Sequence, residues 1–459
     1  MERILIVGAG TAGTTLAHDL KQNKFHLAGF LDDFEIKNKE GKILGKLNDV
    51  NKVIELYKIT DIYISIPSAD SELIRRFINL ITLKKVKISI IPPSFKILAK
   101  ETVNIRDLKP LDILYILGRK QVKQDIIAAK KQLRNKVVLI TGTAGSIGSE
   151  LTRQTAYLGA KKVIGVDWWE LGIFNMRQEL GKYKNVFLSV ANIQSQERMQ
   201  EIISLYEPDI IFHAAAYKHV PLMQEFSTEA FNNNVWGSWN MMQLAVKNKV
   251  RDFIYVSTDK AVNPVNVMGS TKRIGEMLME ILAEKQTKTK LNAVRFGNVI
   301  ASSGSVIPIF QRQIDAGLPV TVTSKDTTRF FMTIEEAVQL IIQTWLLGEN
   351  GEIFVLDMGN PVKIIDIAEN MIRMSGKNIP LKFIGLRNGD KIHEELTFNP
   401  EKVTKTRNPK IYINKNEKDF DKQKFYNQVT KLLRLSRSYL LNNKKMIAEL
   451  KKFDFKIIK

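Results

Sequence analysis

The chain of 459 residues contains no cysteine, only 5 histidines and no long run of apolar residues. The absence of cysteine excludes disulfide bonds, thiolate catalysis and cysteine-ligated metals, and it favours a cytoplasmic location. No apolar run reaches the roughly 18 residues that a membrane-spanning helix needs. No secretory signal is visible before the first strand-like residues, Ile4 to Val7. With 44% hydrophobic and 25% charged residues, the composition is that of a globular protein with two or three domains.

The formal net charge of +21 is distributed unevenly along the chain. Residues 135–400 carry 28 basic and 27 acidic side chains, whereas residues 401–459 carry 17 basic and 6 acidic ones. Nucleic acid is not expected as a partner, because no basic–aromatic interleaving and no known binding module accompany this charge. Solvated lysine-rich helix faces explain the excess most simply. Attraction to anionic lipid or to an acidic protein partner is the alternative.

Two segments share one order of features: an apolar strand, a glycine turn, a helix, a second strand and an aspartate. This order predicts a βαβ unit with a right-handed crossover in each segment. The expected fold class is therefore α/β, with two doubly wound (Rossmann-like) parallel-sheet domains, a small substrate-binding subdomain and a helical C-terminal tail. The glycines and aspartates are Gly8, Gly10, Gly13 and Asp32 in the first segment, and Gly142, Gly145, Gly148 and Asp167 in the second.

The expected domain boundaries follow from the positions of these two βαβ units. We expect a Rossmann-like nucleotide-binding-type domain in residues 1–118, a helical linker in 119–134, a catalytic domain in 135–400 and a basic helical tail in 401–459. Later strands of the catalytic domain are expected at residues 185–189, 210–213, 253–257 and 292–295. Apolar residues at helical spacing predict that the tail forms a helical cap with a basic outer face: Phe425, Val429, Leu432 and Leu433.

The second glycine turn has the chemistry of a dinucleotide site. Glycines at 142, 145 and 148 allow a tight turn and close approach to a pyrophosphate at the following helix N-terminus. Asp167 lies 22 residues after Gly145, where a carboxylate binds the adenosine ribose. No arginine follows to receive a 2′-phosphate, which favours NAD over NADP. No comparable group of catalytic residues follows the turn at Gly8. The first segment therefore either binds a nucleotide or serves as a spacer or regulator.

The proton-handling residues are unusual. Met268 and Lys272 have the spacing of the Tyr-x-x-x-Lys pair of short-chain dehydrogenases, but a thioether replaces the phenol. A methionine cannot take a proton from an alcohol. Either the site is inactive, or Thr258, Asp259 and Lys260 handle the protons.

Several further motifs accompany these residues: His213-Ala-Ala-Ala-Tyr-Lys-His-Val-Pro-Leu-Met223, Asn233-Asn-Val-Trp-Gly237, Arg295-Phe-Gly-Asn-Val299 and Arg329-Phe-Phe-Met-Thr-Ile334. By these motifs residues 110–400 resemble the bacterial polysaccharide-biosynthesis UDP-N-acetylglucosamine 4,6-dehydratases, in the group whose active-site tyrosine is methionine. These enzymes are extended short-chain dehydrogenases. The resemblance implies a homodimer that uses NAD and UDP-N-acetylglucosamine and that serves surface polysaccharide or protein glycosylation. Family members are often membrane-anchored, whereas the lack of a long apolar run predicts a cytoplasmic location here, with peripheral contact to membrane or glycosylation partners. The resemblance implies no metal.

The implied reaction is redox-neutral: oxidation at C4, elimination of water across C5 and C6, and return of the hydride to C6. Elimination needs a base at C5 and an acid at the C6 hydroxyl. We assign Lys260 as the base and Asp259 as the acid, which requires a lowered pKa for the lysine and a raised pKa for the aspartate. Thr258 is expected to hydrogen-bond the C4 oxygen. The base for the C4 hydroxyl proton stays open.

Lys272 is expected to hold the nicotinamide ribose, and Met268 either packs at the reacting carbon or is an ordinary core residue. The other cofactor-binding residues expected from the turn and the resemblance are Gly142, Gly145, Ser146, Ile147, Gly148, Asp167, Asn192, Ile193, Ala214, Ala215 and Ala216. The expected substrate-binding residues are Lys218, His219, Asn298, Ser305, Val306, Pro308, Thr321, Arg329 and Arg387.

Three hypotheses follow for the function. The first is a UDP-N-acetylglucosamine 4,6-dehydratase that retains the configuration at C5. The second is the same elimination with inversion at C5, which Met268 disfavours because inverting members generally keep the tyrosine. The third is a catalytically silent scaffold that binds NAD or a nucleotide sugar, which the intact Asp259, Lys260 and Lys272 disfavour.

Overall fold

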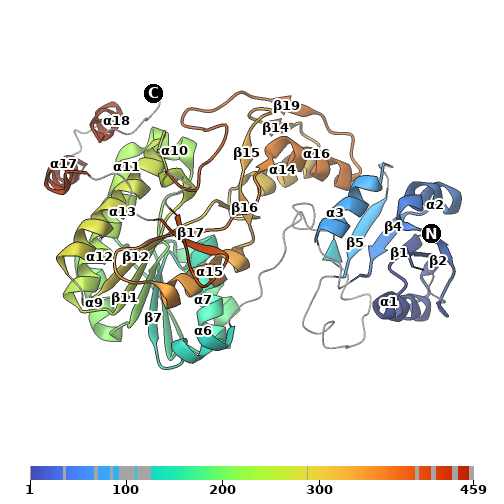
Figure 1. The fold of residues 1–459 in the computed structure, drawn as a ribbon, viewed down its shortest axis with the longest axis horizontal. Helices are drawn as coiled ribbons and strands as arrows, with labels where there is room; N and C mark the ends of the chain where they lie inside the picture. The colour runs from blue at the N-terminus through green and yellow to red at the C-terminus, as the bar shows by residue number, and fades with distance from the viewer. Residues whose placement is uncertain are drawn as a thin grey trace. The chain divides into compact units, whose positions relative to one another are not determined.

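The computed structural model describes residues 2–34, 38–66, 71–82, 86–91, 109–110, 126–286, 288–398, 403–414, 420–436 and 443–453. The chain divides into two compact units (Figure 1). Unit 1 comprises Met1–Gln121, Val306–Lys325 and Val362–Ile384, and unit 2 comprises Val122–Ser305, Asp326–Pro361 and Gly385–Lys459. None of the helices in the described ranges has both the length and the apolar character that crossing a bilayer requires.

Unit 1 is built on a six-stranded sheet with the order β3-β2-β1-β4-β5-β6, in which β6 alone pairs antiparallel. The order reverses between β1 and β4, which makes the sheet doubly wound. Its strands are β1 (Arg3–Val7), β2 (His26–Leu31), β3 (Ile43–Gly45), β4 (Asp61–Ile64), β5 (Lys87–Ile90) and β6 (Lys109–Pro110). Its helices are α1 (Thr11–Gln22), η1 (Leu47–Asp49), α2 (Val50–Tyr57) and α3 (Ser71–Leu80).

Unit 1 also includes two later segments of the chain. In them β14 pairs parallel with β19, and helix α14 packs against α16. These segments are the small additional subdomain that the fold prediction includes. The elements are α14 (Val306–Asp315), β14 (Val320–Val322), β18 (Val362–Lys363), α16 (Ile364–Ser375) and β19 (Leu381–Phe383).

Unit 2 contains a nine-stranded sheet with the order β20-β21-β17-β12-β11-β10-β7-β8-β9. Seven strands are parallel, and β21 and β20 add an antiparallel edge. The predicted α/β class with parallel doubly wound sheets is confirmed. The parallel strands are β7 (Val137–Thr141), β8 (Lys162–Asp167), β9 (Val186–Val190), β10 (Ile210–His213), β11 (Asp252–Val256), β12 (Lys290–Arg295) and β17 (Ile353–Leu356). Two short strands, β13 (Asn298–Val299) and β16 (Phe331–Met332), pair beside it.

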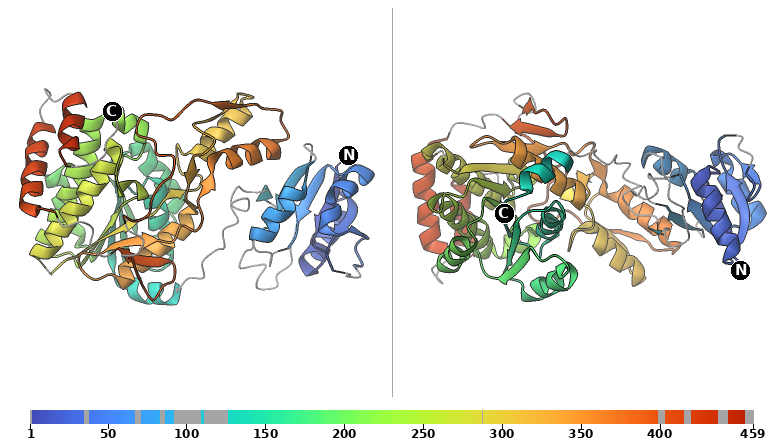
Figure 2. Two further views of the ribbon diagram at one scale, coloured as in Figure 1. Left: turned by 45° about the horizontal axis from the view of Figure 1, so that its top comes forward. Right: turned by 90° about the horizontal axis from the view of Figure 1, so that it is seen from below.

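Helices cover both faces of this sheet, as Figure 2 shows. Strand β7 is buried at every position and apolar except at Thr141, as expected for a parallel strand covered on both sides. Because side chains alternate along a strand, Leu139 joins one core and Val138 and Ile140 join the other. One core includes α9 (Gln196–Tyr206), η3 (Asn232–Gly237), α12 (Ser238–Lys247) and α13 (Val267–Lys285); the other includes α6 (Ile126–Leu133), α7 (Ser146–Tyr157) and α15 (Ile334–Leu347). The remaining helices are α8 (Glu170–Leu180), α10 (Val220–Glu225) and α11 (Ser227–Phe231).

The C-terminal tail is helical where expected, in α17 (Lys422–Ser436) and α18 (Asn443–Lys451). The predicted apolar residues of α17 are buried in the core formed by α12 and α13, and α18 adds Met446 and Leu450. Helix α17 contacts α11 and η3, and α18 contacts α11 and α13. The tail also contributes the two edge strands β20 (Val403–Lys405) and β21 (Ile411–Asn414), which the sequence analysis did not predict.

The expected domain boundaries stay predictions. The boundaries after residues 118 and 400 lie outside the described residues. Helix α6 ends at Leu133, next to the boundary expected after residue 134.

Gly148 provides a test of the glycine turn of unit 2. A Cβ at Gly148 would lie 2.0 Å from the carbonyl oxygen of Gly142, so Gly148→Ala should lower the free energy of unfolding by roughly 1–3 kcal/mol. At Gly145 the nearest atom would be 3.3 Å away, so Gly145→Ala is the matched control. Denaturant unfolding measures both variants, and equal losses would contradict the packing argument.

Candidate active site

The glycine turn follows β7 and packs directly under the first turn of α7. Gly142 has a φ of +72°, and its amide donates to the carbonyl of Val166 at 2.8 Å. Gly145 is the N-cap of α7 and brings no side-chain acceptor to the first helix amides. These amides can therefore serve an anion, and the missing Cβ atoms leave room for the close approach of a pyrophosphate.

The other predicted cofactor-binding residues border this turn. Asp167, at the end of β8, accepts hydrogen bonds from the amides of Ala144 and Trp169, both at 3.0 Å. Ala214 donates its amide to Thr141, and a Cβ at Gly142 would lie 2.6 Å from the amide nitrogen of Ala215. The segment after β10 thus runs beside the glycine turn.

A second group lies after β9. Asn192 accepts the amide of Gln194 at 2.9 Å, while Ile193 is buried against Gly237. Ser146 accepts the amide of Ser303 at 3.2 Å. The residues around the turn therefore fit a dinucleotide, with the carboxylate of Asp167 at the ribose end.

The residues predicted for proton handling occupy the carboxyl end of β11. Thr258 is the N-cap of η4 (Asp259–Ala261), and its hydroxyl donates to Asp259 Oδ1 at 2.8 Å. Lys260 Nζ donates to the same oxygen at 3.0 Å. Asp259 has no solvent exposure, and its Oδ2 has no hydrogen-bond partner among the described residues. The structure thus joins Thr258, Asp259 and Lys260 through one carboxylate.

Lys260 has more oxygen neighbours than the sequence indicates. Its Nζ donates to Asn298 Oδ1 at 3.1 Å and lies 3.7 Å from Glu394 Oε1. Burial by itself would lower the pKa of Lys260, but Asp259 and Glu394 outweigh it and raise the pKa above 10.5. The expected lowering of this pKa is therefore wrong, because two carboxylates flank the amine.

Lys272 has the opposite environment. It is buried, and its Nζ lies 3.9 Å from the centre of the Tyr255 ring. Burial lowers the pKa of Lys272 to about 7, although the charge of Glu276 opposes this shift. Beside it, burial and then Lys272 lower the pKa of His213 to about 3. The neutral His213 is hydrogen-bonded to Thr141 and Ser238, which gives it a structural role.

Met268 is buried in the core that includes α12 and α13. Its backbone carbonyl accepts the hydroxyl of Thr271 at 2.7 Å, and Thr271 in turn accepts from Asn234. The Met268 side chain therefore fills space where a phenol would bring an ionisable group.

A buried ion cluster that the sequence analysis missed lies next to the loop of Thr258, Asp259 and Lys260 and holds Ser257, the residue before this loop. Glu276 accepts Ser257 Oγ at 2.6 Å, Arg295 at 2.5 and 2.7 Å, and Arg273 at 3.1 Å. Burial would raise the pKa of Glu276, but Arg295 and then Arg273 outweigh it and lower the pKa below 4.5. The cluster ties the ends of β11 and β12 to α13. The spacing of Arg273 and Glu276 on one helix face was a signal in the sequence.

The predicted substrate-binding residues are only partly brought together. Lys218 lies close enough to Lys260 that burial and then this neighbouring charge lower its pKa. The ring of His219 packs against Gly304. Arg329 donates to the carbonyls of Thr328, Lys391 and Ile392, so its guanidinium is held by the backbone.

The remaining substrate candidates stay predictions. Arg387 is exposed and pairs with Asp390, and the buried hydroxyl of Ser305 has no partner among the described residues. Val306, Pro308 and Thr321 belong to unit 1.

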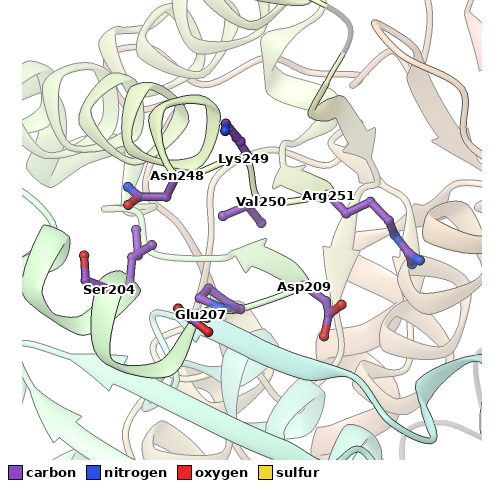
Figure 3. A pocket seen from close by; sticks show the side chains of 9 residues that line it. Ser204, Glu207, Asp209, Asn248, Lys249, Val250 and Arg251 are labelled. Carbon is purple, nitrogen blue, oxygen red and sulfur yellow. The ribbon is translucent and has the colours of Figure 1, made fainter.

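One hollow of about 380 Å³ lies elsewhere in unit 2 (Figure 3). Its lining includes Glu207, Asp209, Lys249 and Arg251, at the chain segments that enter β10 and β11. Ligands of parallel α/β sheets bind at the carboxyl ends of the strands, which is the opposite edge. The hollow is therefore separate from the group around Asp259.

A family model described as polysaccharide biosynthesis protein matches residues 138–416. The capsular polysaccharide biosynthesis protein CapD of Staphylococcus aureus is 40% identical over 407 residues, which are 85% of this chain and 68% of that protein. The probable polysaccharide biosynthesis protein EpsC of Bacillus subtilis is 40% identical over 429 residues, 90% of this chain and 71% of that protein.

Among solved structures, Pen from Bacillus thuringiensis matches with a TM-score of 0.59 and 28% identity, over 65% of this chain and 99% of that one. A double mutant of the dTDP-glucose 4,6-dehydratase DesIV from Streptomyces venezuelae, with NAD bound, matches with a TM-score of 0.53 and 19% identity. It covers 56% of this chain and 87% of that one, and at this identity the likeness concerns the fold.

Glu276→Ala tests the ion cluster. The substitution leaves the buried Arg295 without its carboxylate, so the free energy of unfolding should fall by roughly 3–5 kcal/mol. Glu284→Ala, on the same helix but at an exposed ion pair with Lys422, is the control and should change it by less than about 1 kcal/mol. A similar small loss in both variants would show that the cluster does not stabilise the unit.

Lys272→Met tests the lowered pKa. The unfolded chain holds the proton up to about pH 10.5, whereas the folded chain releases it near 7. Burial of the lysine therefore costs stability at and below pH 7, and this cost disappears as the pH rises toward 10.5. The methionine variant should be more stable than the parent by a few kcal/mol near pH 7, at ~1.4 kcal/mol per pKa unit. Unfolding measured from pH 6.5 to 9 should show this difference shrinking, and a constant difference would contradict the assignment.

Proposed function

The chain belongs to the polysaccharide biosynthesis protein family, and from this premise we propose that it is an NAD-dependent UDP-N-acetylglucosamine 4,6-dehydratase that retains the configuration at C5. One observation carries the proposal. The hydrogen-bonded Asp259–Lys260 pair lies at the carboxyl end of β11, in a chain whose tyrosine position is occupied by a buried methionine. The pair can supply the base and the acid of an elimination without a phenol.

The broader class has separate support. CapD and EpsC are polysaccharide biosynthesis proteins by name, and the UDP-glucose 4-epimerase of Rickettsia akari is 33% identical over 324 residues, 93% of its length. Together with the fold of DesIV, these likenesses support an enzyme that modifies nucleotide sugars as a dehydratase or epimerase. An epimerase has no need of the acid–base pair at Asp259 and Lys260, which favours dehydration.

NAD is the cofactor, held by the glycine turn and by Asp167 at the adenosine ribose. When bound, it would supply a reversible acceptor for the hydride of sugar C4, which C6 receives at the end of the reaction. Lys272 holds the nicotinamide ribose. Its pKa of about 7 lets it add positive potential in the protonated state and lose the proton at little cost.

The elimination is the work of Asp259 and Lys260. The raised pKa of Lys260 keeps its amine charged, and Asp259 accepts its hydrogen bond over 3.0 Å. Transfer of that proton to Asp259 yields a neutral base and a neutral acid with no exchange of protons with solvent. A water-poor pocket favours this neutral pair. Lys260 then takes the C5 proton, the C5–C6 double bond forms, and the C6 hydroxyl leaves as water with the proton from Asp259.

Thr258 orients this pair, because its hydroxyl donates to the oxygen of Asp259 that Lys260 also contacts. The same hydroxyl can turn to the C4 oxygen of the sugar. Lys218 and His219 are assigned to the nucleotide-sugar side of the site.

Met268 supports retention at C5. Inversion requires a proton donor on the face of the sugar opposite to Lys260, and a buried thioether cannot donate one. Lys260 is then the single group assigned to C5, so it returns the proton to the face from which it was taken.

A homodimer in the cytoplasm, with peripheral contacts to membrane or glycosylation partners, is part of the same proposal. So are the domain assignments of residues 1–118, 119–134, 135–400 and 401–459. The oligomeric state is measurable by light scattering of the purified chain.

The test is incubation of the purified chain with UDP-N-acetylglucosamine and no added reductant. Mass analysis should show a product that has lost one water, and in deuterated water the product should carry deuterium at C5 in the retained configuration. Lys260→Ala should reduce product formation by a factor on the order of 100 or more while NAD stays bound. Full dehydration by Lys260→Ala would remove the base assignment, and an unchanged sugar with the parent chain would refute the dehydratase.

A further inference from the structure

Glu394 is a buried carboxylate beside Lys260 that no motif of the sequence analysis singles out. Its side chain is 4% exposed, and its Oε1 lies 3.7 Å from Lys260 Nζ and 3.6 Å from Arg329 Nε. Its Oε2 is buried and has no hydrogen-bond partner within the described part of the chain. Burial of this carboxylate costs desolvation free energy, so its position beside two cationic side chains calls for a functional explanation.

The segment that carries Glu394 is fixed by the same arginine. Arg329 donates to the backbone carbonyls of Lys391 and Ile392, three and two residues before Glu394. Lys391 in turn donates to the carbonyl of Val262, next to η4. Glu394 is thus held at a defined place relative to the loop of Lys260.

We propose that Glu394 is a positioning residue of the elimination, a fixed negative charge that makes the neutral amine of Lys260 a stronger base. The inference rests on the proposed dehydratase function. Asp259 cannot play this part, because as the acid it carries a proton when Lys260 is the base. Glu394 keeps its charge in that state and stabilises the ammonium that forms as Lys260 takes the C5 proton.

The charges around Lys260 determine whether removal of the Glu394 charge raises or lowers the pKa of Lys260. Two carboxylates, Asp259 and Glu394, raise its pKa, while burial and the charge of Arg329 lower it. Lys218 is a further cation within electrostatic reach, and Asn298 contributes a neutral oxygen. Removal of the Glu394 charge leaves one carboxylate against two cations, so the amine must hold its proton less tightly.

Site-specific acetylation measures this directly. The full chain is labelled with trace acetic anhydride across a range of pH, and the extent of labelling at Lys260 is read by mass analysis of its peptide. Because the neutral amine alone reacts, the midpoint reports the proton affinity of Lys260. Glu394→Gln should move the midpoint to lower pH by roughly 1–3 units, the effect of an opposite charge within 4–6 Å.

Glu395→Gln is the matched control. Glu395 is the next residue, but its side chain is 52% exposed and pairs with Lys391 and Asn263 instead of Lys260. It should leave the Lys260 midpoint unchanged. Glu394→Asp keeps the charge at a longer distance and should give a shift smaller than that of Glu394→Gln, which provides a second variant if the glutamine variant does not fold.

The rate of elimination is a second measurement. A purely structural role of Glu394 would not slow this one step selectively. Glu394→Gln should slow elimination on the order of tenfold or more, so that quenched reactions accumulate a sugar that has lost two hydrogens at C4 but has kept its C6 hydroxyl. Glu394→Asp should restore part of the elimination rate. Glu395→Gln should match the parent chain.

The outcomes separate this inference from the proposed function. If the parent chain dehydrates UDP-N-acetylglucosamine and Glu394→Gln neither shifts the Lys260 midpoint nor slows elimination, the inference alone is overturned. A midpoint that moves to higher pH overturns it as well. If the parent chain forms no dehydrated product, the proposed function fails and the role of Glu394 in elimination fails with it.

Discussion

The ammonium of Lys260 is the group around which the site is organised. Taking this charge out of water is costly, and the chain offsets the cost with three oxygens, one each from Asp259, Asn298 and Glu394. Two of the three ammonium donors bond to Asp259 and Asn298, and Glu394, at 3.7 Å, contributes its negative charge without a hydrogen bond. The three oxygens come from η4, from β13 and from the segment after β19, and one side chain therefore holds three distant parts of the chain together.

Two buried lysines in one site have opposite proton affinities. Lys260 is flanked by carboxylates and keeps its proton, whereas Lys272 packs on the Tyr255 ring and has a pKa of about 7. Environments that separate two similar groups in this way assign them different chemical roles. Under the proposed function, the site works without the phenol of short-chain dehydrogenases because proton transfer is assigned to Lys260 and electrostatic support of the cofactor to Lys272.

The glycine turns of the two units have the same construction. In each, the aspartate after the second strand accepts the amide of the loop alanine, Ala9 to Asp32 at 2.7 Å and Ala144 to Asp167 at 3.0 Å. The third glycine also packs on the carbonyl of the first in both turns. What differs is the residues that follow corresponding strands: β11 of unit 2 is followed by the Thr258–Lys260 motif, whereas its counterpart β5 of unit 1 is followed by Ile91. A shared turn therefore does not by itself make a shared site.

Local patterns in the sequence determined the two doubly wound sheets, the glycine turns, the Thr258–Lys260 loop and the helical tail, because each depends on residues within one or two adjacent elements. The strands β20 and β21 escaped prediction, since a short edge strand has little periodicity of its own and forms only where a sheet offers a partner. The direction of the Lys260 pKa, the backbone contacts of Arg329, the pairing of Glu276 with Arg295 and the place of Glu394 were decided by tertiary structure alone. Glu394 follows Lys260 by 134 residues, and an electrostatic effect depends on distance in space and on burial, neither of which the order of residues along the chain records.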